Sequence, residues 1–206
     1  MIFGKGPVAI EAAQLLIAEG YDLRFAVPSS TELPDQPSLG SWAVENGIDV
    51  RRPSRLDALD LDHADLGVSA FFDRIFRQRH IDAFEMLVNV HNSPLPRYRG
   101  VRPINWALKN GETVHGVTLH IITPGIDEGP VLDQELYPID PEEDEVRDVY
   151  GRGLDAATRL LRRAIPSIWD LPHVDQVEAD ATYYSAADDD RLGDRRYWTR
   201  ADASLD

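Results

Sequence analysis

The sequence predicts an α/β protein in which helices cover both faces of a mostly parallel, twisted β-sheet. Short apolar runs alternate with segments of helical periodicity through the first half of the chain. Strands that alternate with helices are joined by right-handed crossovers, which make neighbouring strands parallel. A length of 206 residues fits one domain, and a hydrophobic fraction of 43% is enough to form its core. These observations together predict a Rossmann-like sheet.

The expected elements follow one another along the chain. Strands are expected at residues 1–3, 23–27, 48–53, 64–72, 87–91, 114–122 and 130–139. Helices are expected at residues 8–20, 38–47 and 103–111, and each closes with a glycine, the residue that commonly follows the last helical turn. The last two strands flank a tight turn, so we expect them to pair as antiparallel neighbours.

A longer helix is expected to begin at residue 140. Asp140 would cap it, Pro141 would take its first position, and Glu143 would close a capping box. Its buried stripe is predicted to comprise Val146, Val149, Tyr150, Ala157, Leu160, Leu161 and Ile165. After this helix the chain is rich in Asp and shows little regular pattern. We therefore expect one domain over residues 1–168 and a C-terminal extension over residues 169–206.

The composition excludes several classes of protein and site. The chain has no cysteine, which excludes disulfides, thiolate zinc sites and a cysteine nucleophile. A formal net charge of −15 disfavours nucleic acid and anionic membranes as partners. No apolar run approaches the ~20 residues that span a membrane, and the first residues lack a signal-peptide pattern. We expect a cytoplasmic protein that binds neither nucleic acid nor a membrane.

Polar side chains end the strand at residues 87–91. Side chains alternate along a strand, so Val88 and Val90 should point to one face while Asn89 and His91 share the other. Ligands of such sheets bind beyond the carboxyl ends of the strands, where this pair falls. Spacing alone favours two interpretations equally: a pair of functional groups, or a core histidine beside a turn-forming asparagine.

A second polar cluster follows the strand at residues 114–122. Asp127 lies in a tight turn flanked by Gly125 and Gly129. Taken alone, Asp127 is best explained by turn chemistry. Taken with Asn89 and His91, it is a carboxylate able to orient an imidazole, and this favours a catalytic site.

Other polar residues give weaker signals. His115 and His120 lie five positions apart on a strand and should face opposite sides, so we expect no metal site. Lys5 lies in a turn before a helix, where a phosphate can bind, although a purely structural turn is the favoured interpretation. Arg97, Arg99 and Arg102 surround the loop that follows the strand at residues 87–91. Their guanidinium groups suit contact with a phosphate or a carboxylate, and the alternative is a solvated loop.

Three stretches resemble the folate-dependent formyltransferases: "NVHNSPLPRYRG", "GVTLH" and "IDEGPVLDQ". That family carries Asn-x-His-x-Ser-Leu-Leu-Pro, then Arg-Gly, then a downstream Asp-x-Gly. The similarity covers most of the chain and is dense over residues 65–134. One departure is Pro94, where the family usually has leucine. The resemblance implies the formyltransferase fold, with residues 1–168 as catalytic domain and residues 169–206 packing on or near the acceptor site.

The resemblance places Asn89, His91 and Asp127 at the catalytic positions. The family transfers a formyl group from 10-formyltetrahydrofolate to an amine. Attack by the amine makes a tetrahedral carbon with a developing oxyanion, which a protonated His91 and the Asn89 amide are suited to stabilise. Asp127 would hold the imidazolium and help to remove the extra proton from the amine.

The resemblance also implies the binding residues. It assigns the folate co-substrate to a wall formed by Phe72, Arg74 and Ile75 and to a closing loop that contains Gly125 and Ile126. The expected acceptor contacts are Lys5, Arg97, Tyr98, Arg99 and Gly100.

Three features of the sequence narrow the range of amines that could accept the formyl group. Strong acidity disfavours tRNA, the loop "GKGP" departs from the Gly-Ser-Asn loop of the purine-pathway enzyme, and "YRGVRPINWALKNGE" is most similar to enzymes that formylate nucleotide-linked amino sugars. The alternatives are another small amine, such as an amino acid, a secondary metabolite or glycinamide ribonucleotide, or hydrolysis of the folate. A folate-binding protein without catalysis is disfavoured by the intact Asn, His and Asp. Dimers are common in the family, so a homodimer is expected from the resemblance alone.

Overall fold

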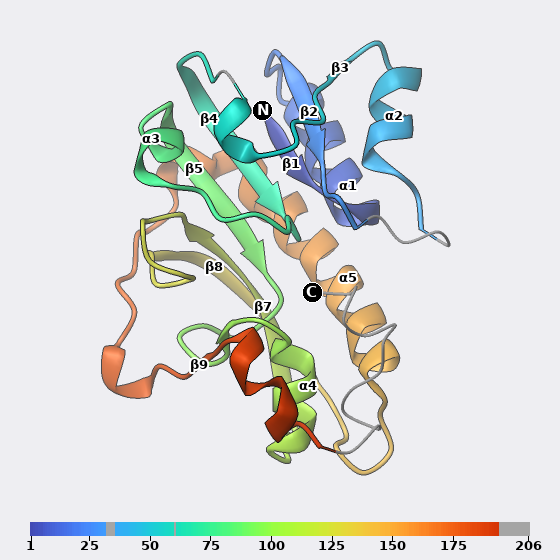
Figure 1. Cartoon of the computed structure of the whole chain (residues 1–206), viewed down its shortest axis with the longest axis vertical. Helices are drawn as coiled ribbons and strands as arrows, with labels where there is room; N and C mark the ends of the chain where they lie inside the picture. Colours follow the sequence, from blue (N-terminus) through green and yellow to red (C-terminus); the bar gives the residue numbers. More distant parts are fainter. Residues whose placement is uncertain (32–35, 60, 194–206) are drawn as a thin grey trace.

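The computed structural model describes residues 1–31, 36–59 and 61–193 (Figure 1). Their strands form one seven-stranded sheet in the order β3-β2-β1-β4-β5-β7-β8. A two-stranded sheet pairs β6 (Arg99–Gly100) in parallel with β9 (Tyr183–Tyr184). The last part of the expected C-terminal extension, residues 194–206, lies outside the described residues.

The main sheet is mostly parallel, as expected. Five strands run in parallel, namely β1 (Ile2–Gly4), β2 (Phe25–Pro28), β3 (Asp49–Val50), β4 (Ala64–Ala70) and β5 (Phe84–His91). The next strand, β7 (Val114–Ile121), is antiparallel to β5, and β8 (Val131–Pro138) is antiparallel to β7. The predicted antiparallel pair is therefore confirmed.

Helices connect and cover these strands. The α-helices are α1 (Gly6–Ala18), α2 (Leu39–Glu45), α3 (Gln78–Ile81), α4 (Pro103–Lys109) and α5 (Val146–Ala164). Short 3-10 turns are η1 (Leu56–Ala58), η2 (Ile165–Asp170), η3 (Glu178–Asp180) and η4 (Ala186–Arg191). Within the described ranges no helix is both long enough and apolar enough to cross a membrane.

Strand alternation divides the core between the two faces of the sheet. Val68 and Val88 belong to the larger cluster, which α1 and α5 complete on the face behind the sheet in Figure 1. Phe3 and Leu87 belong to a smaller cluster on the other face, which the segment around α3 helps to cover. Because Asn89 and His91 alternate with buried valines, they project to the thinly covered face, where a ligand can approach.

The predicted start of the long helix is wrong, although its buried stripe is confirmed. The helix begins at Val146, not after Asp140. The Asp140 N–H donates to Asp144 Oδ2 at 2.7 Å, and its Oδ1 accepts from the Glu142 N–H at 2.9 Å, which closes a separate turn. Asp144 also pairs with Arg152 from the helix. The carboxylate of Asp144 therefore stabilises a turn that competes with the expected cap.

Candidate active site

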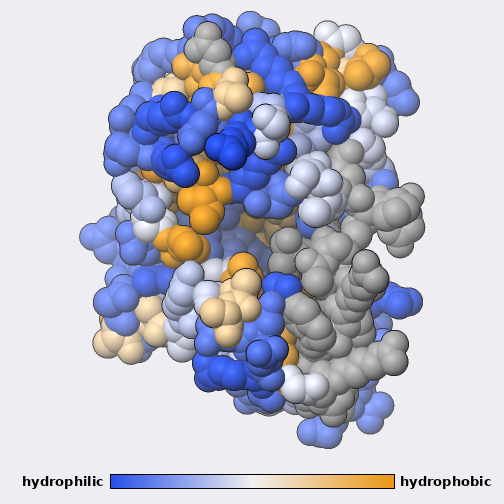
Figure 2. Space-filling view, viewed as in Figure 1, coloured by the Kyte–Doolittle hydropathy of each residue, from blue (hydrophilic) through white to orange (hydrophobic). Residues whose placement is uncertain are grey.

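The carboxyl ends of β4 and β5 open into a cavity of about 320 Å³. Asn89, His91 and Asp127 all line it, which brings together two residues from β5 and one from the loop between β7 and β8. Figure 2 shows the surface hollowed across the middle of the molecule, with hydrophobic side chains gathered beside the hollow. The three residues that sequence motifs predicted to be catalytic therefore line one cavity that is open to the surface.

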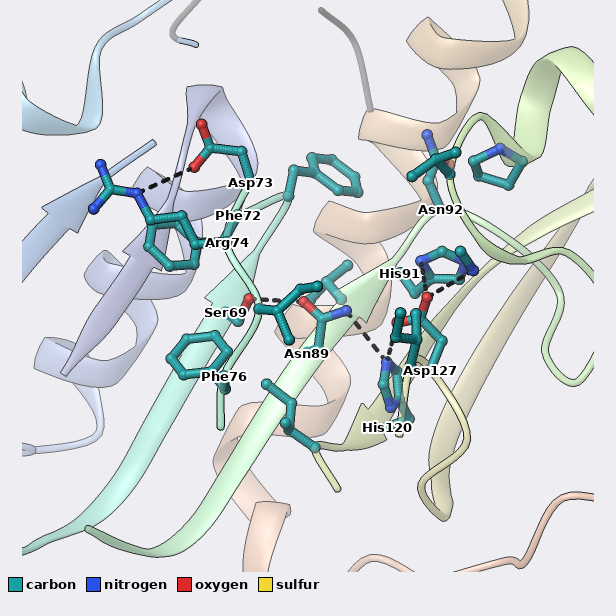
Figure 3. A pocket seen from close by; sticks show the side chains of 18 of the residues that line it. Ser69, Phe72, Asp73, Arg74, Phe76, Asn89, His91, Asn92, His120 and Asp127 are labelled. Carbon is teal, nitrogen blue, oxygen red and sulfur yellow. Dashed lines mark hydrogen bonds and ion pairs between the residues drawn. The ribbon is translucent and has the colours of Figure 1, made fainter. Parts of the chain in front are cut away.

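Asn89 is held by a chain of hydrogen bonds that runs across the sheet (Figure 3). Its Oδ1 accepts from the Ser69 hydroxyl on β4 at 2.7 Å. Its Nδ2 donates to His120 Nε2 on β7 at 3.2 Å. His120 Nδ1 in turn donates to the Ile121 carbonyl at 3.0 Å, which leaves Nε2 as the acceptor. A carboxamide nitrogen carries two hydrogens, so one remains for a ligand in the cavity.

His91 is oriented by the loop that follows its own strand. Its Nε2 donates to the Tyr98 carbonyl at 2.9 Å. Its Nδ1 faces Asp127 Oδ2 at 3.6 Å, a distance typical of an ion pair without a direct hydrogen bond. Because the backbone occupies Nε2, Nδ1 is the nitrogen that can exchange a proton with a ligand in the cavity.

Asp127 receives three polar contacts from three segments. Oδ2 accepts from the Gly100 N–H at 2.9 Å and faces His91, while Oδ1 lies 3.5 Å from His120 Nε2. Burial alone would raise the pKa of Asp127, but the charge of the nearby His91 and the hydrogen bond from the Gly100 N–H bring that pKa well below its usual range. Asp127 is therefore a carboxylate throughout the neutral pH range, at a left-handed backbone position with φ 53°.

His120 is the residue whose role the sequence interpretation missed. The sequence suggests for His120 only a metal pair with His115, and that residue lies on the opposite face of β7 as expected. The neighbours of His120 in the fold come from the register that pairs Asn89 with His120 across β5 and β7. The sequence interpretation lacked the antiparallel pairing of β7 with β5, which places His120 opposite Asn89. The spacing of His115 and His120 along the chain does not reveal this pairing.

The five residues predicted to bind folate all line the cavity. They are Phe72, Arg74, Ile75, Gly125 and Ile126. Further apolar side chains extend the same wall, contributed by Phe71, Phe76 and Ile122. The Arg74 guanidinium donates to the Pro53 carbonyl at 2.7 Å, so the charged group is anchored at the side of the wall. The wall on this side of the cavity is therefore largely apolar.

One of the five residues predicted to contact the acceptor lines this cavity. Of the five, Gly100 lines the cavity, whereas Lys5 is 1% exposed and lies outside the lining. Arg97 pairs with Glu112 on the surface, the Tyr98 side chain is buried, and Arg99 pairs with Glu178. Their contact with an acceptor stays a prediction.

Two residues outside the predicted acceptor set do line the cavity. Arg102, at φ 54°, lies 3.2 Å from Asp189 of η4, and Tyr183 of β9 is 52% exposed. Both depend on the C-terminal segment, whose irregular sequence gave no signal for this placement. The structure thus brings part of the extension to the wall of the cavity.

The arrangement suits transfer of an acyl-type group between two bound molecules. It offers an amide donor, an imidazole with one exchangeable nitrogen and a permanent carboxylate. The Ser69 hydroxyl, which also lines the cavity, donates to the Asn89 side chain and not to a base. Direct transfer therefore fits this geometry better than a covalent enzyme intermediate.

A family model described as "Formyl transferase" matches residues 46–165. The chain belongs to the formyl transferase family. Among solved structures, WlaRD, a sugar 3N-formyl transferase determined in the presence of dTDP and 5-N-formyl-THF, is 26% identical, with a TM-score of 0.78 over 91% of this chain and 70% of that one. An N-formyltransferase from Helicobacter canadensis, in complex with folinic acid and dTDP-3-aminofucose, is 28% identical with a TM-score of 0.77 and the same coverage.

The fold is shared more widely in this family. Glycinamide ribonucleotide transformylase 1 from Symbiobacterium toebii is 24% identical, with a TM-score of 0.67 over 85% of this chain and 95% of that chain. At 24% identity, this similarity supports a shared fold and nothing about activity. The formyl transferase sheet predicted from the sequence is thereby confirmed.

Proposed function

We propose that this formyl transferase moves the formyl group of 10-formyltetrahydrofolate to the amino group of a nucleotide-linked amino sugar. The observation that carries this proposal is the convergence of Asn89, His91 and Asp127 on one cavity. Support comes from WlaRD and the Helicobacter canadensis enzyme, which were solved with folate derivatives and with dTDP or a dTDP-sugar. Cytoplasmic location and a homodimer stay predictions.

The cavity fits the folate co-substrate by its shape and chemistry. Phe72, Phe76, Ile75 and Ile126 offer apolar surface for a flat bicyclic ring. Backbone groups beside Gly125 lie at the end of this surface nearest Asp127. The co-substrate, once bound, supplies an activated formyl group, and the protein's task is to orient it toward the amine.

The protein's own groups divide the work of transfer. The free hydrogen of Asn89 Nδ2 and a proton on His91 Nδ1 are suited to stabilise negative charge that develops on the formyl oxygen. Asp127 holds the imidazolium through charge, and its fixed negative charge assists, through water, the departure of the proton that the attacking amine must lose. The leaving nitrogen of the folate takes up a proton, so that no net charge is created.

The test is the release of tetrahydrofolate from 10-formyltetrahydrofolate, followed spectroscopically against a panel of amines. The panel contains dTDP-, UDP- and GDP-linked amino sugars, glycinamide ribonucleotide, free amino acids and a control without amine. We expect release that depends on a nucleotide-linked amino sugar, with the formamide identified by mass spectrometry. Release that requires a different amine would replace the proposed acceptor.

Two further outcomes would contradict the proposal itself. Release at the same rate without any amine would identify a hydrolase. If no release occurs with any acceptor while 5-formyltetrahydrofolate still binds, the protein would be a folate binder without this transferase activity. The control variant His91→Asn separates enzyme turnover from spontaneous decay of the co-substrate.

A further inference from the structure

The segment that follows η2 returns to the catalytic loop through one side chain, Gln176. Its Nε2 donates to the backbone carbonyls of Asp127 and Gly129, each at 2.8 Å. Its Oε1 accepts from Arg99 Nε at 3.0 Å. The carboxamide therefore joins the loop that carries Asp127 to the loop that follows His91.

The site of attachment is the strained part of the catalytic loop. Asp127 has φ 53°, a left-handed conformation that is unfavourable for a residue with a side chain. Its carboxylate direction depends on this conformation, because Oδ2 must meet the Gly100 N–H at 2.9 Å and face His91. A donor fixed on the Asp127 carbonyl restrains the rotation of the peptide that would turn the carboxylate away.

The same segment has other anchors that do not involve Gln176. Val174 pairs through its backbone with Val131, and Thr182 exchanges bonds with the loop at Pro96 and Tyr98. Tyr184 stacks between Trp106, at 4.1 Å between ring centroids, and Tyr98, at 5.9 Å. The loss of the Gln176 carboxamide would therefore leave the segment docked, and its effect would be local to the catalytic loop.

We propose that Gln176 is a positioning residue that holds Asp127 in its catalytic conformation by donating to the Asp127 and Gly129 carbonyls. The inference rests on the proposed function for its kinetic consequences. It adds a requirement that the family motifs did not contain: the segment after the long helix takes part in setting the geometry of the acid–base group.

Three variants separate the hydrogen bonds that Gln176 donates from the packing of its side chain. Gln176→Ala removes all three contacts, and we expect kcat to fall by about 10- to 100-fold, the scale expected for misplacement of a catalytic group. Gln176→Glu keeps the shape and the acceptor for Arg99 but loses both donors, so it should lose at least as much activity. Val177→Ala changes a neighbouring side chain that is 58% exposed, and should match the wild type.

A double-mutant cycle tests whether Gln176 acts through Asp127. Single-turnover rates are compared for Gln176→Ala, Asp127→Asn and the double variant. If Gln176 acts through the carboxylate, Gln176→Ala should cost little more once Asp127→Asn is present. Equal fold losses in both backgrounds would overturn the proposal, as would a Gln176→Glu variant with wild-type kcat.

A crystal structure of Gln176→Glu gives a readout that does not need turnover. We expect the Asp127 carboxylate to leave the Gly100 N–H, which is 2.9 Å away in the wild type. An unchanged carboxylate would overturn the inference even if the protein proved to have another activity. Failure of the wild type to transfer a formyl group would instead overturn the proposed function, and the two results are read separately.

Discussion

At the level of single residues, Asp127 lies between His91 and His120 in the candidate site. Its two oxygens face His91 and His120 separately, and the Gly100 N–H fixes their orientation. The charge of this carboxylate should therefore matter more than its volume, since a neutral amide of the same shape cannot hold an imidazolium.

Asp127→Asn should lower kcat by about 10²- to 10⁴-fold, because the site loses the negative charge that assists proton removal and pairs with His91. Binding of 5-formyltetrahydrofolate should change little, since the apolar wall remains. Rapid-quench kinetics and equilibrium dialysis measure the two quantities. Asp62→Asn, which alters an exposed carboxylate paired with Arg24, is the matched control. An Asp127→Asn variant with near wild-type kcat would refute the assigned role.

His120→Phe should lower kcat by about fivefold to tenfold, the value of one lost hydrogen bond to Asn89. The ring keeps its volume in β7 but offers Nδ2 of Asn89 no acceptor. His63→Phe, at a side chain 65% exposed, is the control. Loss of folate binding instead of kcat would show that His120 supports the pocket rather than the amide.

The residues of the candidate site and Gln176 differed in how far the sequence could predict them. Asn89 and His91 were readable because strand alternation places both on one face near a strand end. His120 was not, because its partner is set by the pairing of β5 with β7, a contact between positions separated by 31 residues. Gln176 was harder still, since its segment has no periodicity and acts through backbone carbonyls.

At the level of elements, the long helix depends on one close approach. Gly153 of α5 faces Asn92 and Tyr137, and a Cβ at Gly153 would lie 2.8 Å from Asn92 Oδ1 and 3.0 Å from Tyr137 Oη. Gly151, two positions earlier, is exposed, and a Cβ there would meet no neighbouring atom within 4 Å. The two glycines of the helix therefore have different reasons to be there.

Gly153→Ala should reduce the free energy of unfolding by about 1–3 kcal/mol, because the added methyl group must displace the buried side chains of Asn92 and Tyr137. Gly151→Ala should raise it by about 0.5–1 kcal/mol, because alanine is the better helix residue at an open position. Chemical denaturation of both variants measures the contrast. Equal effects of the same sign would contradict this difference in packing.

The helix start shows where local sequence rules fail. Asp140, Pro141 and Glu143 fit a helix start, but Asp144 binds the Asp140 N–H and pairs with Arg152 one element later. A contact that spans the turn and the helix outcompetes a cap made by neighbours. The sheet and most helices were predictable because their periodicity records the burial of apolar side chains, and this burial provides the main driving force for folding.

At the level of the whole molecule, one buried histidine couples stability to pH. His115 of β7 is fully buried, and burial lowers its pKa from 6.5 to about 4 despite a 2.9 Å hydrogen bond from Nε2 to the Asn92 carbonyl. The unfolded chain takes up a proton on this ring at a pH at which the folded protein does not. The contribution of His115 to the free energy of unfolding is therefore fully present above pH 6.5 and is lost as the pH falls toward 4.

His115→Gln should remove this pH dependence. In the wild type the His115 contribution to the slope is about 1.4 kcal/mol per pH unit between these limits, with a total of at most about 3 kcal/mol. Urea unfolding at several pH values measures the slope for both proteins, and comparison cancels the other titrating groups. Even if His115→Gln is less stable overall, its slope remains informative. Identical slopes would contradict the assignment.

Gln176 and Thr182 reach back 77 and 84 positions to Arg99 and Tyr98. Because a domain generally folds as a unit, these contacts can form only once residues 176–184 have emerged from the ribosome. The geometry around Asp127 therefore depends on a segment that is translated well after the strand that carries Asn89 and His91. The onset of activity during translation would thus mark the docking of this late segment rather than the formation of the sheet.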